Sequence, residues 1–134
     1  MSIIDELYKE LNISQYAYKE LEYFCLQYKE KKQEINNCYG VSSIQYGFRP
    51  GNRKISNTTL SNAEKAISLK KDIEMIEQSA IEADSNIYGY ILRNVTEKIL
   101  YEYMDVPCGR RQFYEKRKLF FCILYMKRRK LING

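Results

Sequence analysis

Apolar side chains recur along this chain at the spacing of an α-helix, and no other feature constrains the fold as much. Over residues 15–39 they follow one another at steps of three, four and seven. These residues are Ala17, Leu21, Phe24, Tyr28 and Ile35. Apolar and polar residues never alternate for the length of a strand. The sequence therefore predicts an all-α protein.

Capping residues mark the ends of the first two helices. Ser2, followed by Asp5, predicts the start of a short helix over residues 2–11. Ser14 can cap the long helix over residues 15–39, and Gly40 is its natural end.

A second long amphipathic helix is expected over residues 59–83. Its apolar stripe has a heptad-like spacing. The stripe consists of Ala66, Leu69, Ile73, Ile76 and Ala80. Two such helices can form an antiparallel hairpin within one chain or the seam of a dimer, and the pattern suits both. We expect a homodimer, because the two stripes offer more apolar face than a hairpin needs.

The residues between these helices, 40–58, have no period and are interrupted by glycine and proline, so we expect a loop. Arg49, Arg53 and Lys54 make this loop basic. It is longer than most connections, which suggests a functional segment. Residues 1–84 are thus interpreted as a helical N-terminal and dimerisation region.

Positive charge is concentrated at the C-terminal end. The whole chain has a net charge of +5. Residues 1–92 carry 11 basic and 13 acidic side chains, a net charge of −2, whereas residues 93–134 carry 11 and 4, a net charge of +7. Such asymmetry is typical of proteins that bind a polyanion, although a solubilising basic tail would show it too.

The composition argues against an enzyme. Histidine is absent, which excludes His-based acid–base chemistry, His-assisted nucleophiles and His metal sites. No phosphate loop or paired acidic motif is present, and we expect neither a cofactor nor a metal.

The four cysteines, at positions 25, 38, 108 and 122, form no C-x-x-C pair. Buried free thiols are the expected state of such cysteines. Cys108 lies close to Arg110 and Arg111 and to a helix start, which would lower its thiol pKa and leaves a redox role open.

The chain shows no targeting pattern. No apolar run approaches the roughly 18 residues of a membrane span. The first residues lack a basic stretch followed by an apolar one. We expect a cytoplasmic protein without a membrane partner.

Residues 85–134 follow the order of a helix-turn-helix. After a short helix capped by Ser85 or Asn86, a second is expected over residues 96–104, with Thr96 as its cap. Its buried side would hold Leu100, Tyr103 and Met104. Residues 105–109 form the turn, in which Val106 is the apolar plug. A long basic helix from Arg110 to Arg128 would be the recognition helix.

This last helix separates apolar from basic residues. Phe113, Phe120 and Leu124 share a narrow arc on the helical wheel. Residues able to read base edges lie at its start; they are Arg110, Arg111, Gln112 and Tyr114. Residues suited to phosphate lie further along and in the basic loop. These are Arg117, Lys118, Lys127, Arg128, Arg129, Lys130, Arg49, Arg53 and Lys54.

Two stretches carry a resemblance to a known family. Residues 55–67, ISNTTLSNAEKAI, resemble the middle of RinA/ArpU-type phage transcriptional regulators. Residues 94–114, NVTEKILYEYMDVPCGRRQFY, are similar to the C-terminal helix-turn-helix of that family, which is like region 4 of sigma factors. The turn departs from the family pattern in being longer than its compact form.

The resemblance implies a regulator of phage or prophage DNA. It would act on double-stranded DNA, either in late-gene transcription or as a recombination directionality factor that promotes excision by a serine recombinase. The alternative is a protein-binding module that contacts a recombinase or RNA polymerase without reading a DNA sequence.

Overall fold

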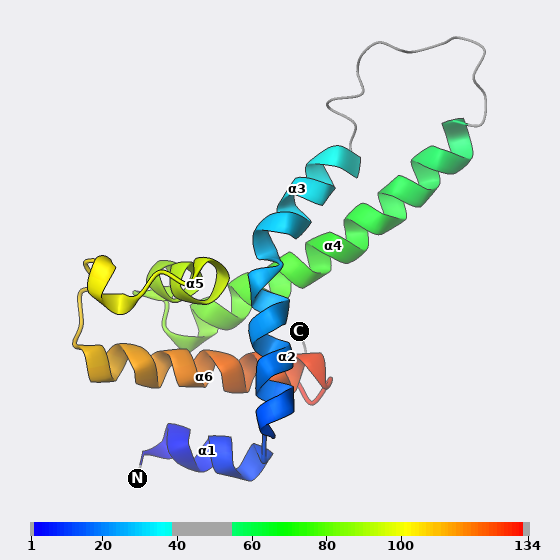
Figure 1. Cartoon of the computed structure of the whole chain (residues 1–134). Coiled ribbons are helices and arrows are strands. Elements are labelled where there is room, and N and C mark those ends of the chain that lie inside the picture. The colour runs from blue at the N-terminus through cyan, green and yellow to red at the C-terminus, as the bar shows by residue number, and fades with distance from the viewer. Residues whose placement is uncertain (1, 39–54, 133–134) are drawn as a thin grey trace. The chain divides into compact units, whose positions relative to one another are not determined.

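The structure, a computed structural model, describes residues 2–38 and 55–132 (Figure 1). Within these residues it is all-helical and contains no strand, which confirms the all-α prediction. The elements are α1 (Ile3–Leu11), α2 (Gln15–Leu26), α3 (Tyr28–Cys38), α4 (Ile55–Ala83), α5 (Tyr88–Glu97), a 3-10 turn (Tyr101–Tyr103) and α6 (Arg110–Arg128).

The predicted caps of the first two helices are present. The Ser2 hydroxyl accepts a hydrogen bond from the Asp5 N–H at 3.1 Å, and the Ser14 hydroxyl accepts one from the Ala17 N–H at 3.0 Å. Asn12 closes α1 in the left-handed conformation, with φ of 50°. An asparagine side chain tolerates this conformation better than most.

Two helix boundaries differ from the prediction. The single helix expected over residues 15–39 is broken at Gln27, whose N–H turns back to the Phe24 carbonyl, so α2 and α3 are separate. The apolar period runs on through this break without glycine or proline, and the sequence therefore did not mark it. The next helix, α4, starts at Ile55 rather than residue 59. Gly40 lies outside the described residues.

The chain divides into two compact units. One consists of residues 28–74 and holds α3 with the first part of α4. Lys31 pairs with Asp72 at 2.9 Å and Glu34 with Lys65 at 3.3 Å. From Lys31 to Glu34 the residue number on α3 rises, while that of the partner on α4 falls from 72 to 65. The two segments therefore run antiparallel. For this unit, the hairpin is the arrangement that the structure adopts.

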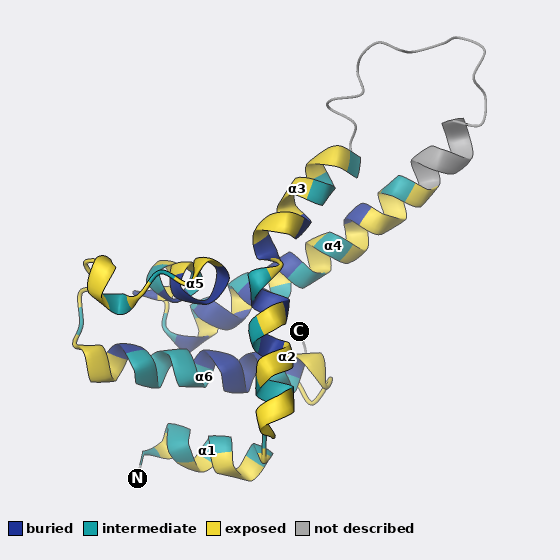
Figure 2. Cartoon of the chain, viewed as in Figure 1, coloured by how far each residue is buried: buried dark blue, intermediate teal, exposed yellow. Residues whose placement is uncertain are grey.

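The other unit consists of residues 1–27 and 75–134. Its centre is α6, which contacts α1, α2 and α5. All residues from Phe120 to Leu124 are buried, together with Phe113, so α6 is covered on every side over residues 120–124 (Figure 2). A helix apolar all round belongs in a core. The end of α4 adds Ile76, Ala80 and Ala83.

The prediction of a helix over residues 96–104 is wrong: α5 ends at Glu97, and only the 3-10 turn over Tyr101–Tyr103 follows. Thr96 lies in the last turn of α5, where its hydroxyl donates to the Leu92 carbonyl at 2.6 Å instead of capping a new helix. Lys98 ends α5 in the left-handed conformation. Leu100 and Tyr103, expected to be buried, are 49% and 79% exposed, and only Met104 is buried as predicted.

The connection between α5 and α6 is also longer than a helix-turn-helix turn. Residues 98–109 separate the two helices, whereas the motif joins its helices by three or four residues. Val106 is half-buried. The start of α5 differs too: its N-cap is Ile87, so neither Ser85 nor Asn86 caps it, and no side chain does. The Asp84 carboxylate accepts from the N–H groups of Asn86 and Ile87, just before the helix, at 2.8 and 3.3 Å.

Candidate functional site

The first turn of α6 presents three of the predicted base-reading residues to solvent. Arg110, Arg111 and Gln112 are all exposed. The N-cap is Gly109, which supplies no side-chain cap, and the first turn holds no acidic residue. The free N–H groups of such a helix start favour an anion. Basic and amide side chains therefore surround an end of the helix that attracts negative charge.

Arg110 is held in place by its surroundings. Its guanidinium donates to the Glu102 carboxylate at 2.9 Å and lies over the Tyr114 ring, 5.2 Å from the centroid. The Glu102 pKa is lowered, first by a backbone hydrogen bond and then by Arg110. Tyr114 is half-buried against Phe113, with the ring centroids 5.2 Å apart. By contrast, Arg111 and Gln112 have no hydrogen-bond or ion-pair partner among the described side chains.

Most of the predicted phosphate-binding side chains of α6 already contact other side chains of the protein. Arg117 donates to the Asn94 amide oxygen at 2.5 Å and to the Tyr18 hydroxyl at 3.0 Å. Lys118 pairs with Asp5 at 2.7 Å. Arg128 lies over the Phe24 ring, 4.0 Å from its centroid. These side chains hold neighbouring helices to α6.

For Lys127, the prediction of a phosphate-facing side chain is wrong. Its side chain is 2% exposed, and its ammonium group donates to Glu82 at 2.9 Å. Arg129 and Lys130 do remain exposed, with the Arg129 guanidinium over the Tyr125 ring at 4.8 Å. Arg49, Arg53 and Lys54 lie outside the described residues.

Cys25 and Cys122 are buried free thiols, as predicted, but Cys108 does not have the expected activation. Burial raises the pKa of the Cys108 thiol, and Asp84 adds to the effect. This is opposite to the lowering expected from the nearby arginines. Burial also raises the pKa of Cys122 to about 11. Thiols with raised pKa values are poor nucleophiles at neutral pH, which removes the basis for a redox role of Cys108.

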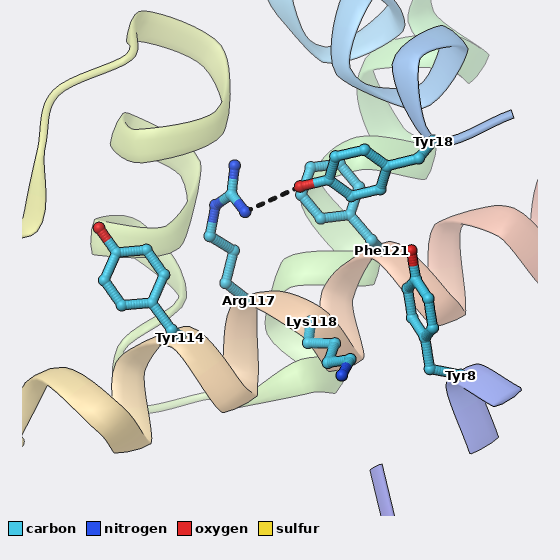
Figure 3. A pocket seen from close by; sticks show the side chains of 6 residues that line it. All are labelled: Tyr8, Tyr18, Tyr114, Arg117, Lys118 and Phe121. Atoms are coloured by element: carbon cyan, nitrogen blue, oxygen red, sulfur yellow. Dashed lines mark hydrogen bonds between the residues drawn. The ribbon is translucent and has the colours of Figure 1, made fainter. Parts of the chain in front are cut away.

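A pocket of about 320 Å³ opens between α1, α2 and α6 (Figure 3). It is lined by Tyr8, Tyr18, Tyr114, Arg117, Lys118 and Phe121. Figure 3 shows Arg117 directed toward Tyr18, and Lys118 directed toward the α1 side. The Tyr18 and Phe121 rings lie 5.0 Å apart by their centroids. Burial raises the pKa of Tyr8, so its phenol stays protonated at neutral pH.

Sequence reasoning had singled out three of these residues, Tyr114, Arg117 and Lys118, but not as the walls of one pocket. It missed Tyr8 and Tyr18, and also the buried Asn94, whose amide donates to the Ile99 carbonyl at 3.0 Å while its oxygen holds Arg117. Only the abundance of tyrosine, 13 residues, hinted at a polar aromatic site. Tyr8 and Tyr114 are far apart in the chain, so no spacing rule could join them.

No metal-binding group of three or more His, Cys, Asp or Glu side chains occurs in the part of the chain that the structure describes. Among the described helices, none is both long enough and apolar enough to cross a membrane.

Comparison of the chain with protein-family models, with curated proteins and with solved structures gives no match.

Proposed function

We propose that this chain binds double-stranded DNA through the N-terminal end of α6. The observation that carries the proposal is the exposure of Arg110, Arg111 and Gln112 on the first turn of a helix whose second half is fixed in a core. A reading helix must present its first residues at defined positions, and an anchored helix does so.

These side chains suit base edges and phosphates. Arginine pairs bidentately with guanine and glutamine with adenine in the major groove. The uncapped N–H groups that follow Gly109 suit a backbone phosphate. Arg110, oriented by Glu102 and the Tyr114 ring, is pre-organised for such a contact.

In this proposal the protein is a regulator of a phage or prophage-like element, as the resemblance to RinA/ArpU-type regulators implies. It acts in late-gene transcription or as a recombination directionality factor that promotes excision by a serine recombinase. The two outputs share the DNA-binding step and differ in the protein recruited.

A protein-binding module is the second candidate, and one observation favours it. Leu100 and Tyr103 are exposed on either side of Glu102, which pairs with Arg110. Exposed tyrosine and arginine beside an apolar side chain form the composition of an interface hot spot. The partner in that case would be a recombinase or RNA polymerase.

The test compares Arg111→Ala with Arg93→Ala, which removes an exposed arginine on α5. A preferred duplex is first selected from a randomised library, and affinities are measured by fluorescence anisotropy on it and on random duplex. We expect Arg111→Ala to lose about 1–3 kcal/mol on the selected duplex and much less on random DNA. Arg93→Ala should change the two affinities alike.

Two results would contradict base reading by α6. One is an equal loss on both duplexes for Arg111→Ala. The other is the absence of any enriched sequence in the selection. If binding to a recombinase or RNA polymerase is then lost in a Leu100→Ser, Tyr103→Ser double variant, the protein-binding candidate is the correct one.

A further inference from the structure

The pocket between α1, α2 and α6 shares only Tyr114 with the surroundings of the duplex-binding residues, where the Tyr114 ring lies under Arg110. Arg110, Arg111 and Gln112 are not among its residues. We propose that this pocket binds a single nucleotide unit, with the base among the tyrosines and the phosphate at Lys118.

The walls suit a planar base. Four of the six lining residues are aromatic: Tyr8, Tyr18, Tyr114 and Phe121. Bases of every kind stack on such rings, because every base has a flat π face. Tyrosine also keeps a hydroxyl for the polar edge of a ligand. The rings come from three different helices, so they surround the space rather than forming a flat stripe.

Arg117 has donors left for the base edge. A guanidinium carries five N–H groups. Hydrogen bonds to Asn94 and Tyr18 use two of them, and the Glu22 carboxylate, at 4.0 Å, is too distant for a third. The plane of the guanidinium is fixed by these partners and by the Phe121 ring, whose centroid lies 5.0 Å away. A fixed arginine suits the two acceptors of guanine better than adenine, whose edge carries a donor.

Lys118 supplies the charge for the phosphate. Its ammonium group lies 4.9 Å from the centroid of the Tyr8 ring and is bound by Asp5. Both side chains of this pair are 38% exposed, so an incoming phosphate can replace the carboxylate without a large change in burial. Among the described residues, no carboxylate lines the pocket itself. Asp5 therefore competes with the ligand for Lys118.

The size of the pocket fits one nucleotide. Ligand pockets span roughly 300–1,000 Å³. At about 320 Å³ this pocket is at the lower end, which suits a mononucleotide and is too small for a dinucleotide cofactor.

The experiment titrates the full chain with 5′-GMP, guanosine and 5′-AMP by calorimetry. We expect saturable binding of GMP, with AMP and guanosine each weaker by about fivefold or more. Lys118→Met, which keeps the apolar stem, should weaken GMP by about tenfold and guanosine by less than about twofold. Lys116→Met is the matched control: Lys116 lies on the same helix, pairs with Asp84 and is 31% exposed, but does not line the pocket.

Guanosine separates a ligand role of Lys118 from a structural one. If Lys118 only fastens α1, Lys118→Met weakens guanosine as much as it weakens GMP. If Lys118 binds phosphate, the loss of about tenfold is confined to GMP, because guanosine has no phosphate to lose. Absence of saturable GMP binding, equal binding of GMP and guanosine, or equal loss in Lys116→Met and Lys118→Met would each overturn the proposal.

Two further arms identify the source of the nucleotide and keep the two proposals separate. A short single-stranded oligonucleotide with a 5′-phosphorylated guanosine is titrated beside GMP. Tighter, Lys118-dependent binding of the strand assigns the site to nucleic acid, and equal or weaker binding assigns it to free nucleotide. Arg111→Ala should leave GMP binding unchanged, so loss of duplex reading does not affect this result.

Discussion

Lys127 shows how a residue in a basic run can belong to a core. The run from Lys127 to Lys130 suits phosphates in the sequence, yet the Lys127 side chain is 2% exposed and its ammonium group is paired with Glu82. The Glu82 side chain is 48% exposed. The two ends of this ion pair therefore differ in how easily water can replace the partner.

That difference predicts unequal effects of removing each partner. Glu82→Ala leaves a buried ammonium group without its carboxylate, and we expect a loss of about 1–3 kcal/mol in the free energy of unfolding. Lys127→Met leaves only a carboxylate that water can reach, and we expect a change below about 1 kcal/mol. Urea denaturation measures both. Glu64→Ala, at an exposed position of α4, is the control. A larger loss for Lys127→Met would refute the argument.

At the scale of elements, α1 differs from the other helices of its unit in the burial of its side chains. It has no buried residue. It contacts α6, and its polar attachment is the pair between Asp5 and Lys118 at 2.7 Å. An element with few buried contacts opens at low free-energy cost. This helix carries Tyr8, so its position decides whether the pocket is complete.

The attachment of α1 should depend on pH. The hydrogen bond from Lys118 holds the pKa of Asp5 below the ordinary 3.8. The contribution of the pair is therefore complete above pH 3.8 and is lost as the pH falls through the lowered value. As the pH is lowered, we expect the NMR resonances of the Tyr8 ring to shift toward those of a free tyrosine. The resonances of the Tyr125 ring should shift only at a lower pH.

Asp5→Asn should show the detached signal of Tyr8 already at neutral pH. A Tyr8 resonance that follows the same pH profile in both proteins would mean that other contacts hold α1.

At the scale of the whole molecule, more than half of the basic side chains of residues 93–134 are paired with carboxylates inside the unit of residues 1–27 and 75–134. Six of the eleven basic side chains in residues 93–134 pair with carboxylates, and five of those carboxylates belong to residues 1–92. The acidic and basic parts of the chain thus complement each other. This is a physical reason for the asymmetry other than a polyanion partner.

Internal pairing limits the salt dependence of DNA binding. Five basic residues of the segment have no carboxylate partner among the described residues: Arg93, Lys98, Arg111, Arg129 and Lys130. Arg110, which the proposed function places on DNA, is a sixth candidate for a phosphate contact. We expect this segment to contribute no more than about −5 to the slope of the logarithm of the affinity against that of the salt concentration. A slope near about −10, measured by anisotropy at several salt concentrations, would mean that the internal pairs open on DNA.

The apolar stripe of α4 also bears on association. Ala66, Ile73, Ile76 and Ala80 are buried within one chain, and Leu69 is half-buried. This stripe, one of the two on which the homodimer prediction rests, is therefore already covered. The homodimer stays a prediction without the support of this stripe.

The sequence by itself determined the class of fold and the starts of α1, α2 and α6. Local signals suffice for these. A capping hydroxyl such as that of Ser2 or Ser14 binds a backbone N–H only three residues away. The apolar period of a helix can likewise be recognised within that helix alone. The same holds for the start of α6 at Arg110 and for its buried Phe113, Phe120 and Leu124.

Only the tertiary structure decided which polar residues are free. Thr96 is a good cap and an equally good partner for the carbonyl four residues before it, and packing selected the second. Likewise, whether Lys127, Arg117 or Lys118 faces solvent depends on carboxylates, amides and rings brought from distant helices. The residues that neighbour a charged side chain in the sequence do not show which distant partner it will have. The pocket, built from three helices, could not be found before those helices were assembled.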